Sequence, residues 1–306
     1  MEHPKISIIV LNWKQEENTS ECLHSLHKID YDNYGIILVD NGSNDSSPDN
    51  LQKKFPDLKI IRNYANLGFA KGNNIGIKEA LKDKPDYILL INNDTTVEPD
   101  FLKILVDYAE SDESIGIASP KIMFYSQPQK IWFVGGKFLL FLKKPFHLFY
   151  GQYDKGQMKE PAEIDWVSGC CMLIRRKVFE EIGMLDADYF HYCEDVDFCI
   201  KAKQHGFKIV VVPDAKIYHK FALSIGGKFS PLATYYRTRN ILLLCKKTGQ
   251  WPALVLNFII FPFYAVGGAV TTKNFRSVIA AFFAVFDFLR GRTGKSAIKN
   301  GVDNVF

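Results

Sequence analysis

The sequence predicts an α/β fold in which a Rossmann-like sheet with flanking helices is followed by apolar C-terminal helices. Two observations support the sheet. Apolar, β-rich runs recur through the first 115 residues, at 5–11, 35–39, 58–61 and 87–91. Amphipathic segments separate or follow them, at 16–28, 46–54, 72–83 and 99–110. This alternation is typical of a parallel sheet whose strands are joined by crossover helices.

Composition excludes several classes of protein. With 306 residues, 47% of them apolar, the chain can bury a substantial core. A net charge of +4, with no nucleic-acid-binding motif, argues against a nucleic-acid partner. The six cysteines form no CxxC pair, so we expect free thiols in a reducing compartment. Residues 1–5 lead straight into a strand without a signal peptide, so we expect the N-terminal part to stay in the cytosol.

Polar residues follow each predicted strand at its carboxyl end. These ends carry Asn12, Asp40-Asn41-Gly42-Ser43, Arg62-Asn63 and Asn92-Asn93-Asp94. Ligands of open α/β sheets bind beyond the carboxyl ends of the strands, so we expect all four clusters to face one crevice. Taken alone, the segment after Val39 fits an ordinary strand-turn-helix junction as well as it fits a ligand-binding segment.

A glycine-rich segment, Asn66 to Asn74, precedes the third helix candidate. It contains Gly68, Lys71 and Gly72, and its backbone N–H groups and lysine suit a diphosphate. The segment is neither a Walker A loop nor a GxGxxG motif, so it is a weak signal by itself. A stronger signal is the pairing of Asp94 with the later acidic cluster Glu194-Asp195-Val196-Asp197, which suits metal-assisted chemistry on a nucleotide-activated substrate.

Six segments, taken in order, resemble the inverting family 2 glycosyltransferases with a GT-A fold, in the branch that contains rhamnosyltransferases. They are Ser7–Trp13, Val39–Ser43, Asn66–Asn74, Leu89–Asp94, Trp166–Arg176 and Tyr192–Asp197. The resemblance covers roughly residues 5–245. We therefore expect a catalytic domain at 1–245, with a nucleotide-sugar half at 1–115 and an acceptor half at 116–245. A membrane-associating or oligomerising tail would occupy 246–306.

The resemblance implies a divalent-metal site, for Mg²⁺ or Mn²⁺, held by Asp94 with His219 as a candidate second ligand. Such a cation favours one or two carboxylates plus phosphate oxygens. The sequence departs from the family's DxD motif because Asn92 stands at the first position, leaving one carboxylate. The alternatives are that Asp94 caps the helix near Pro99 and that His219 is structural.

The resemblance also implies that Asp195 is the general base that deprotonates the acceptor hydroxyl. Glu194 and Asp197 would orient the acceptor, or else compensate the dipole of a helix start. Gly169 would allow close approach where a strand passes beneath the acceptor, and Trp166 would stack on a sugar or pack in the core. Residues 135–160, rich in Phe, Lys and Tyr, would form an acceptor-side insertion.

Donor contacts are assigned to the polar strand ends and to the glycine-rich segment. Asp40 and Asn41 would contact the base or ribose. The full set of expected donor-binding residues is Asn12, Asp40, Asn41, Ser43, Asn66, Gly68, Lys71, Asn73 and Asn92.

Two apolar stretches near the C-terminus suggest a membrane. Residues 251–270 carry no formal charge, but Pro252, Asn257 and Pro262 interrupt them, and the second stretch, 278–289, is short and contains Asp287. Cations flank both stretches. We therefore expect interfacial or re-entrant helices rather than a spanning pair. The alternative is that they pack on the catalytic domain or form a homo-oligomer interface.

The sequence as a whole predicts a membrane-associated, metal-dependent, inverting glycosyltransferase at the cytoplasmic face of the plasma membrane. It would move a sugar, with rhamnose as the first guess, from a nucleoside diphosphate-sugar to a glycan or polyprenyl-linked acceptor in cell-surface polysaccharide biosynthesis. Two alternatives stay open. One is a nucleotidyltransferase, and the other is a non-catalytic membrane scaffold.

Overall fold

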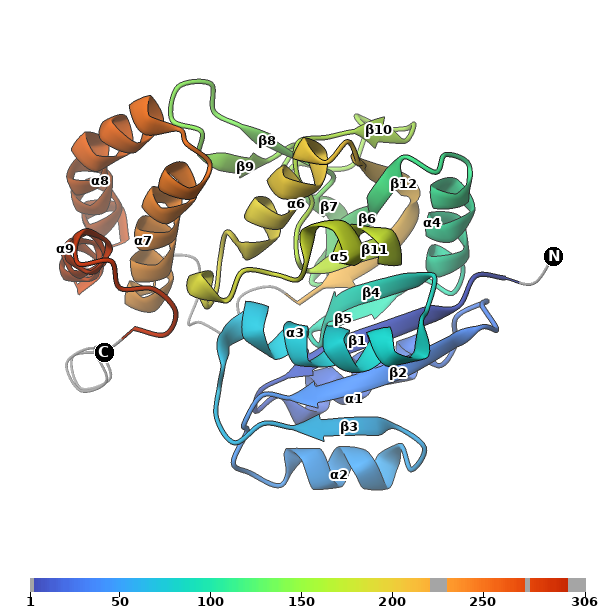
Figure 1. The fold of residues 1–306 in the computed structure, drawn as a ribbon. Coiled ribbons are helices and arrows are strands. Elements are labelled where there is room, and N and C mark those ends of the chain that lie inside the picture. Colours follow the sequence, from blue (N-terminus) through green and yellow to red (C-terminus); the bar gives the residue numbers. More distant parts are fainter. Residues whose placement is uncertain (1–2, 221–229, 273–275, 297–306) are drawn as a thin grey trace.

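The computed structural model describes residues 3–220, 230–272 and 276–296, which form one large mixed sheet with helices around it (Figure 1). The sheet has ten strands. Its main path runs β10 (Ala162–Glu163), β12 (Lys208–His219), β6 (Ile115–Phe124), β11 (Cys171–Arg175), β4 (Tyr87–Asn92), β1 (Ile6–Asn12), β2 (Tyr34–Asp40) and β3 (Lys59–Arg62). Off this path, β5 (Thr95–Val97) pairs with β12 and β7 (Gln127–Phe133) pairs with β6.

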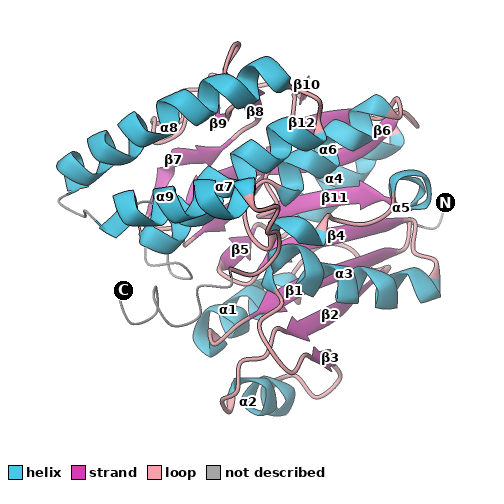
Figure 2. Cartoon of the chain, turned by 60° about the vertical axis from the view of Figure 1, so that its left-hand side comes forward, coloured by secondary structure: helices cyan, strands magenta, loops and turns pink. Residues whose placement is uncertain are grey.

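The N-terminal half of the sheet is parallel, as the sequence predicts. Strands β3, β2, β1 and β4 lie side by side in one direction, and the register sets Asn12 opposite Asp40. Figure 2 shows this half with α3 (Gly68–Ala80) crossing the near face of the sheet. Helices α1 (Glu16–Leu26) and α2 (Ser47–Lys54) also belong to this half, whereas α4 (Phe101–Glu110) packs against β6 and β12 of the second half. All four predicted strands and all four predicted helices are therefore confirmed.

The second half of the sheet reverses direction next to β4. Strand β11 is antiparallel to both β4 and β6, whereas β12 is parallel to β6. At its far end β12 pairs with β5, which sets His219 opposite Thr95. Helices α5 (Arg176–Ile182) and α6 (Glu194–Gln204) cover this half, and a separate hairpin of β8 (Gly136–Phe138) and β9 (Pro145–His147) borders it.

Two local expectations were wrong. Helix α3 begins at Gly68, not after the glycine-rich segment, because Asn66 Oδ1 accepts the Gly68 N–H at 2.9 Å and the chain turns there at φ +83°. Residues 68–74 are therefore helical. Gly169 lies in a turn that precedes β11 and not within a strand.

Three C-terminal helices pack together beside the β8–β9 hairpin (Figure 1). They are α7 (Pro231–Lys247), α8 (Trp251–Thr272) and α9 (Arg276–Leu289). The predicted boundary at residue 245 falls in the last turn of α7. Asp287 of α9 is buried and accepts a hydrogen bond from the Tyr235 hydroxyl of α7 at 2.7 Å. Within the described ranges, no helix is both long and apolar enough to cross a membrane.

The Tyr235–Asp287 hydrogen bond should contribute to the free energy of unfolding, because it joins α9 to α7. We expect Tyr235→Phe to lower the free energy of unfolding by about 1–2 kcal/mol, because it leaves a buried carboxylate oxygen without its hydroxyl donor. Urea unfolding would measure this. Tyr64→Phe is the control, since Tyr64 is fully exposed. Equal stability of the two variants would contradict the role given to this bond.

Candidate functional site

Asp94 and His219 form a buried pair where the two halves of the sheet meet. Asp94 lies in the turn between β4 and β5, and His219 ends β12. The Asp94 Oδ1 and His219 Nε2 atoms are 3.1 Å apart, and Lys220 N–H donates to the Asp94 carbonyl at 2.8 Å. Burial raises the pKa of Asp94, but His219, a backbone hydrogen bond and Lys220 together hold the pKa of this carboxyl below its usual range. The helix-cap alternative for Asp94 is wrong, since α4 begins after Asp100.

This pair fits a divalent cation that is shared with a substrate. One carboxylate oxygen and one imidazole nitrogen converge, and the indole of Trp132 packs against the His219 ring at a centroid distance of 4.4 Å. Among the residues that the structure describes, no group of three or more His, Cys, Asp and Glu side chains could hold a metal by itself. Mg²⁺ and Mn²⁺ accept few protein ligands when phosphate oxygens complete the coordination. The donor set therefore suits a metal bound together with a diphosphate.

Asp195 stands at the start of α6 with its carboxylate held by backbone. Its Oδ2 accepts the Gly169 N–H at 2.8 Å, and its Oδ1 accepts the Val196 N–H at 2.8 Å. Burial raises the pKa of Asp195 despite these two hydrogen bonds. The pKa of the neighbouring Glu194 is raised well above its ordinary value by burial and then by the charge of Asp195. A half-buried carboxylate with a raised pKa is a competent general base.

Gly169 contacts Phe69 and donates its N–H to Asp195, and its expected approach to an acceptor stays a prediction. A Cβ at this position would lie 3.0 Å from two ring carbons of Phe69 and 3.5 Å from the Asp195 Cβ. The missing side chain therefore lets α3 and α6 close on the turn that precedes β11.

The Asp94 and Asp195 carboxylates lie at the same edge of the sheet. Asn92 N–H, at the end of β4, donates to the Cys170 carbonyl at 2.9 Å, in the turn that also presents Gly169. Burial raises the pKa of the Cys170 thiol, and both carboxylates add to that rise. The acidic residues on which the sequence prediction rests are therefore brought together.

Several expected donor-binding residues lie just beneath this edge and bond one another. Asp40 accepts hydrogen bonds from Asn12 Nδ2 at 3.0 Å and from both the backbone and the hydroxyl of Ser43. All three side chains are buried. In this structure they support the strand-end loop, and their contact with a donor stays a prediction.

The remaining donor candidates organise the start of α3. Asn41 Oδ1 accepts the Leu67 N–H at 3.1 Å, and Asn41 Nδ2 donates to Asn66 and to the Gly68 carbonyl. Asn73 is buried and donates to the Phe69 carbonyl at 3.0 Å. Lys71 is exposed on the first turns of α3, and Asn92 is half-buried at the end of β4. Their donor contacts also stay predictions.

Two acceptor assignments need correction. Trp166 is 4% exposed, and its ring packs on Phe133 and His147 at centroid distances of 5.5 and 5.3 Å, so the core-packing alternative holds. Asp197 is buried, accepts the Tyr189 hydroxyl at 3.2 Å and pairs with Lys201 at 2.6 Å. Neither side chain is presented to a substrate.

Sequence reasoning missed two residues of the supporting network. Asn93 Nδ2 donates to the Thr19 hydroxyl at 2.8 Å, and that hydroxyl donates to Asn12 Oδ1 at 2.9 Å. This chain of bonds joins the Asp94 turn to the end of β1. Asn93 lay inside the recognised motif, whereas Thr19 sits in a helix with no local signal.

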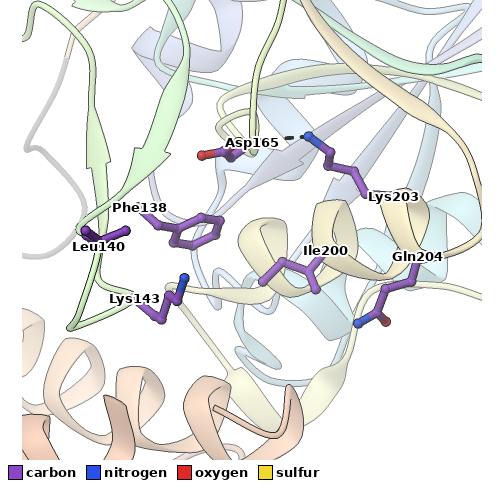
Figure 3. Close-up of a pocket in the computed structure, with 7 residues that line it drawn as sticks. All are labelled: Phe138, Leu140, Lys143, Asp165, Ile200, Lys203 and Gln204. Carbon is purple, nitrogen blue, oxygen red and sulfur yellow. Dashed lines mark ion pairs between the residues drawn. The ribbon is translucent and has the colours of Figure 1, made fainter. Parts of the chain in front are cut away.

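A hollow of about 520 Å³ lies between the β8–β9 hairpin and α6, and none of the expected site residues lines it (Figure 3). Phe138, Leu140 and Lys143 contribute from the segment that we expect to be an acceptor-side insertion, and an ion pair of 3.9 Å joins Lys203 to Asp165 across it. The lining is completed by Ile200 and Gln204.

A mixed sheet with a carboxylate–histidine pair beside the end of β4 and a second carboxylate at the start of α6 is the arrangement expected of a nucleotide-sugar transferase of the GT-A type. The protein-family model described as Glycosyl transferase family 2 matches residues 7–183 of the chain. The chain therefore belongs to this family. It is a glycosyltransferase that uses a nucleoside diphosphate-sugar donor, of the class that builds cell-surface polysaccharides. The nucleotidyltransferase and scaffold alternatives are set aside.

Known proteins agree with this assignment. The chain is 29% identical over 240 residues to the N-acetylglucosaminyl-diphospho-decaprenol L-rhamnosyltransferase of Mycobacterium tuberculosis, covering 71% of this chain and 77% of that protein. It is 25% identical over 272 residues to the dTDP-rhamnosyl transferase RfbF of Shigella flexneri, covering 85% and 87%. The crystal structure of GalNAc-T7 with UDP, GalNAc and Mn²⁺ shares the fold, with a TM-score of 0.64 at 18% identity, over 80% of this chain and 48% of that one.

Gly68 tests how closely the start of α3 approaches Phe190, in the segment before α6. A Cβ there would lie 2.3 Å from the Phe190 carbonyl oxygen, and its φ is +83°. We expect Gly68→Ala to destabilise the fold by about 2–4 kcal/mol through the left-handed backbone and the clash. Thermal unfolding would measure it. Gly35→Ala is the control, because a Cβ at Gly35 meets no atom within 4 Å. Native stability of Gly68→Ala would contradict the close approach.

Proposed function

We propose that the protein transfers a sugar with inversion, with Asp195 taking the proton of the acceptor hydroxyl while the nucleoside diphosphate leaves from the opposite face of the sugar. The observation that carries this proposal is the meeting of the Asp94–His219 pair and the backbone-held Asp195 at one edge of the sheet. An inverting displacement needs these two functions on opposite sides of one reacting carbon.

Asp195 holds the proton at its carboxylate after transfer. Its two backbone hydrogen bonds fix the orientation of the group, and its raised pKa favours accepting a proton from a hydroxyl. Burial, followed by the charge of Asp195, also raises the pKa of the neighbouring Glu194.

Asp94 and His219 would hold Mg²⁺ or Mn²⁺, which when bound neutralises charge on the departing diphosphate. The Mn²⁺ in the GalNAc-T7 structure supports a divalent metal. Asn92 leaves only Asp94 to supply a carboxylate, so substrate oxygens would complete the coordination.

The named relatives support the donor and the acceptor. Two of them are rhamnosyltransferases, one of which is named for a dTDP-linked donor and the other for a decaprenol-linked acceptor. We therefore favour deoxythymidine diphosphate-rhamnose as donor and a polyprenyl-linked or glycan hydroxyl as acceptor.

The base assignment predicts a separation of binding from transfer. We expect Asp195→Asn to bind the donor within about threefold of the natural protein and to lose at least 100-fold in kcat, because the amide cannot accept the proton. Transfer from dTDP-rhamnose and thermal stabilisation by dTDP with Mn²⁺ would be measured in parallel. Asp94→Asn is the matched variant and should lose the Mn²⁺-dependent stabilisation instead.

The pH dependence of kcat checks the same assignment. A base must be deprotonated, so kcat should fall as the pH decreases through the raised pKa of Asp195, at a higher pH than an ordinary aspartate would give. Full transfer by Asp195→Asn would remove this residue from the role. Stabilisation by triphosphates alone, without turnover of any sugar nucleotide, would contradict the proposed function.

We also propose that α8 and α9 dock on the cytoplasmic surface of the plasma membrane. Helix α9 turns its small residues Ala280, Ala281 and Ala284 inward and its large apolar ones outward. The exposed apolar side chains of the two helices are Trp251, Val255, Phe258, Ile259, Phe263, Ile279, Phe282, Phe283, Phe286 and Leu289. Arg276, Arg290 and Arg292 lie at the ends of α9 and are exposed, which suits an anionic lipid surface.

The outward aromatics predict lipid binding. We expect the double variant Phe282→Gln, Phe286→Gln to bind vesicles of phosphatidylglycerol and phosphatidylcholine at least tenfold more weakly than the natural protein, because apolar area is lost. Co-sedimentation would measure this, with the exposed Tyr64→Gln as control. The membrane proposal fails if the natural protein binds no vesicle and light scattering shows that it is a dimer, whereas the double variant is a monomer. The apolar surface would then bind a second copy of the chain.

A further inference from the structure

Three of the four residues before Glu194 have an unfavourable backbone conformation. Phe190, Tyr192 and Cys193 adopt positive φ of 62°, 70° and 73° without being glycine. The left-handed region is disfavoured for L-residues, and such residues persist only where the surroundings hold them. Cys193 is the residue that caps α6, yet its side chain makes no capping hydrogen bond. The position of Asp195 therefore depends on contacts from elsewhere in the chain.

These contacts come from α7, through Asn240. Its Nδ2 atom lies 2.8 Å from the Tyr189 carbonyl oxygen, 2.7 Å from that of His191 and 2.8 Å from that of Tyr192. The side chain is fully buried. One amide group thus lies within hydrogen-bond distance of three backbone carbonyl oxygens of an irregular segment. Without it, these carbonyl groups would need other donors.

Arg239 fixes the orientation of that amide and extends the same contact. Its Nε donates to Asn240 Oδ1 at 2.9 Å, and one terminal nitrogen donates to the Tyr189 carbonyl at 3.0 Å. The other terminal nitrogen donates to the Gly294 carbonyl at 2.7 Å. Arg239 is 1% exposed, so a buried cation is committed to backbone oxygens of this segment and of the chain beyond α9.

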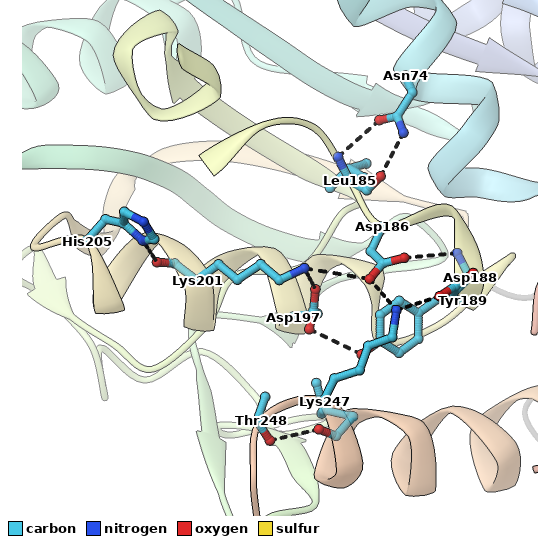
Figure 4. Close-up of polar contacts among 11 residues, drawn as sticks. Asn74, Leu185, Asp186, Asp188, Tyr189, Asp197, Lys201, His205, Lys247 and Thr248 are labelled. Atoms are coloured by element: carbon cyan, nitrogen blue, oxygen red, sulfur yellow. Dashed lines mark hydrogen bonds and ion pairs between the residues drawn. The ribbon is translucent and has the colours of Figure 1, made fainter. Parts of the chain in front are cut away.

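Residues 185–190 form hydrogen bonds with α3 and ion pairs with α7. Asn74 of α3 exchanges hydrogen bonds with Leu185, and Phe69 N–H donates to the Phe190 carbonyl at 2.6 Å. Lys247 of α7 pairs with Asp186 at 2.5 Å and with Asp188 at 2.7 Å, as Figure 4 shows. The segment before α6 is therefore held between α3 and α7.

We propose that Asn240, oriented by Arg239, is a positioning residue for the base: it holds the irregular segment 189–193, in which three residues have a positive φ, and so keeps the Asp195 carboxylate against the Gly169 N–H. This inference rests on the proposed role of Asp195. A rotation within 190–193 would turn the first residues of α6 and break the 2.8 Å bond from Gly169. Small misplacements of a catalytic group cost about 100-fold in rate.

The test compares two buried asparagines on neighbouring helices. Asn240→Ala removes the donor to residues 189–192. Asn257→Ala is the matched control, because Asn257 of α8 is also buried and its Nδ2 donates to the Leu142 and Ala253 carbonyls at 2.7 and 2.8 Å, outside the base segment. Each variant would be assayed for kcat, for donor KM and for hydrogen exchange resolved by segment.

We expect Asn240→Ala to lose about 100-fold in kcat with donor KM changed less than threefold, and to exchange faster over residues 189–196. Asn257→Ala should retain kcat within about threefold and exchange faster near residues 139–143 instead. The double variant Asn240→Ala, Cys193→Gly should recover at least tenfold of the lost kcat, because glycine adopts a positive φ without the penalty that Cys193 incurs.

Each contrary result is decisive. The proposal is overturned if Asn240→Ala keeps its kcat, if kcat falls without faster exchange over 189–196, or if the two alanine variants lose kcat equally. It is also overturned if Asn240→Ala and its Cys193→Gly derivative fail to fold while Asn257→Ala folds. Hydrogen exchange can be measured without turnover. If the natural protein were inactive but Asn240→Ala still exchanged faster over residues 189–196, the proposed function would be wrong and the structural role of Asn240 would stand.

Discussion

The pairing of β5 with β12 is the constraint on which the candidate site depends. It is antiparallel and short, yet it sets His219 opposite Thr95, next to the turn that carries Asp94. Since β12 is also parallel to β6, its long run through the second half of the sheet delivers a histidine to the carboxyl end of β4. Without this pairing, the two halves of the sheet would share a core but would not bring Asp94 and His219 together.

Beneath that edge lies a polar layer that keeps the strand ends in place. Asn12, Asp40 and Ser43 bond one another, and Asn93 with Thr19 connects them to the Asp94 turn. Buried polar groups of this kind are stable only when their hydrogen bonds are met, so the layer has few alternative arrangements. The layer therefore fixes the strand ends relative to one another and to the Asp94 turn.

The sequence predicted the features that are set locally and by pattern. The four strands of the parallel half are continuous apolar runs, and Asp94 and Asp195 follow recognisable motifs, so the family and the acidic residues could be identified. Contacts set by distant segments could not. Whether Trp166 faces a sugar or the core depends on Phe133 and His147, and whether Asp197 faces an acceptor depends on Tyr189 and Lys201.

The groups that we assign to chemistry lie largely outside the part of the chain that defines the family. The family match ends at residue 183, just after α5, whereas Asp195, His219 and Asn240 all follow it. The matched part contains the polar strand ends, Asp94 and the Gly169 turn. The later part contains the proposed base, the second candidate metal ligand and the helix that contacts the segment before the proposed base. Because α7 also packs against α8 and α9, whose outer faces are apolar, the helix that carries Asn240 is in direct contact with the two helices that we propose to dock on a membrane.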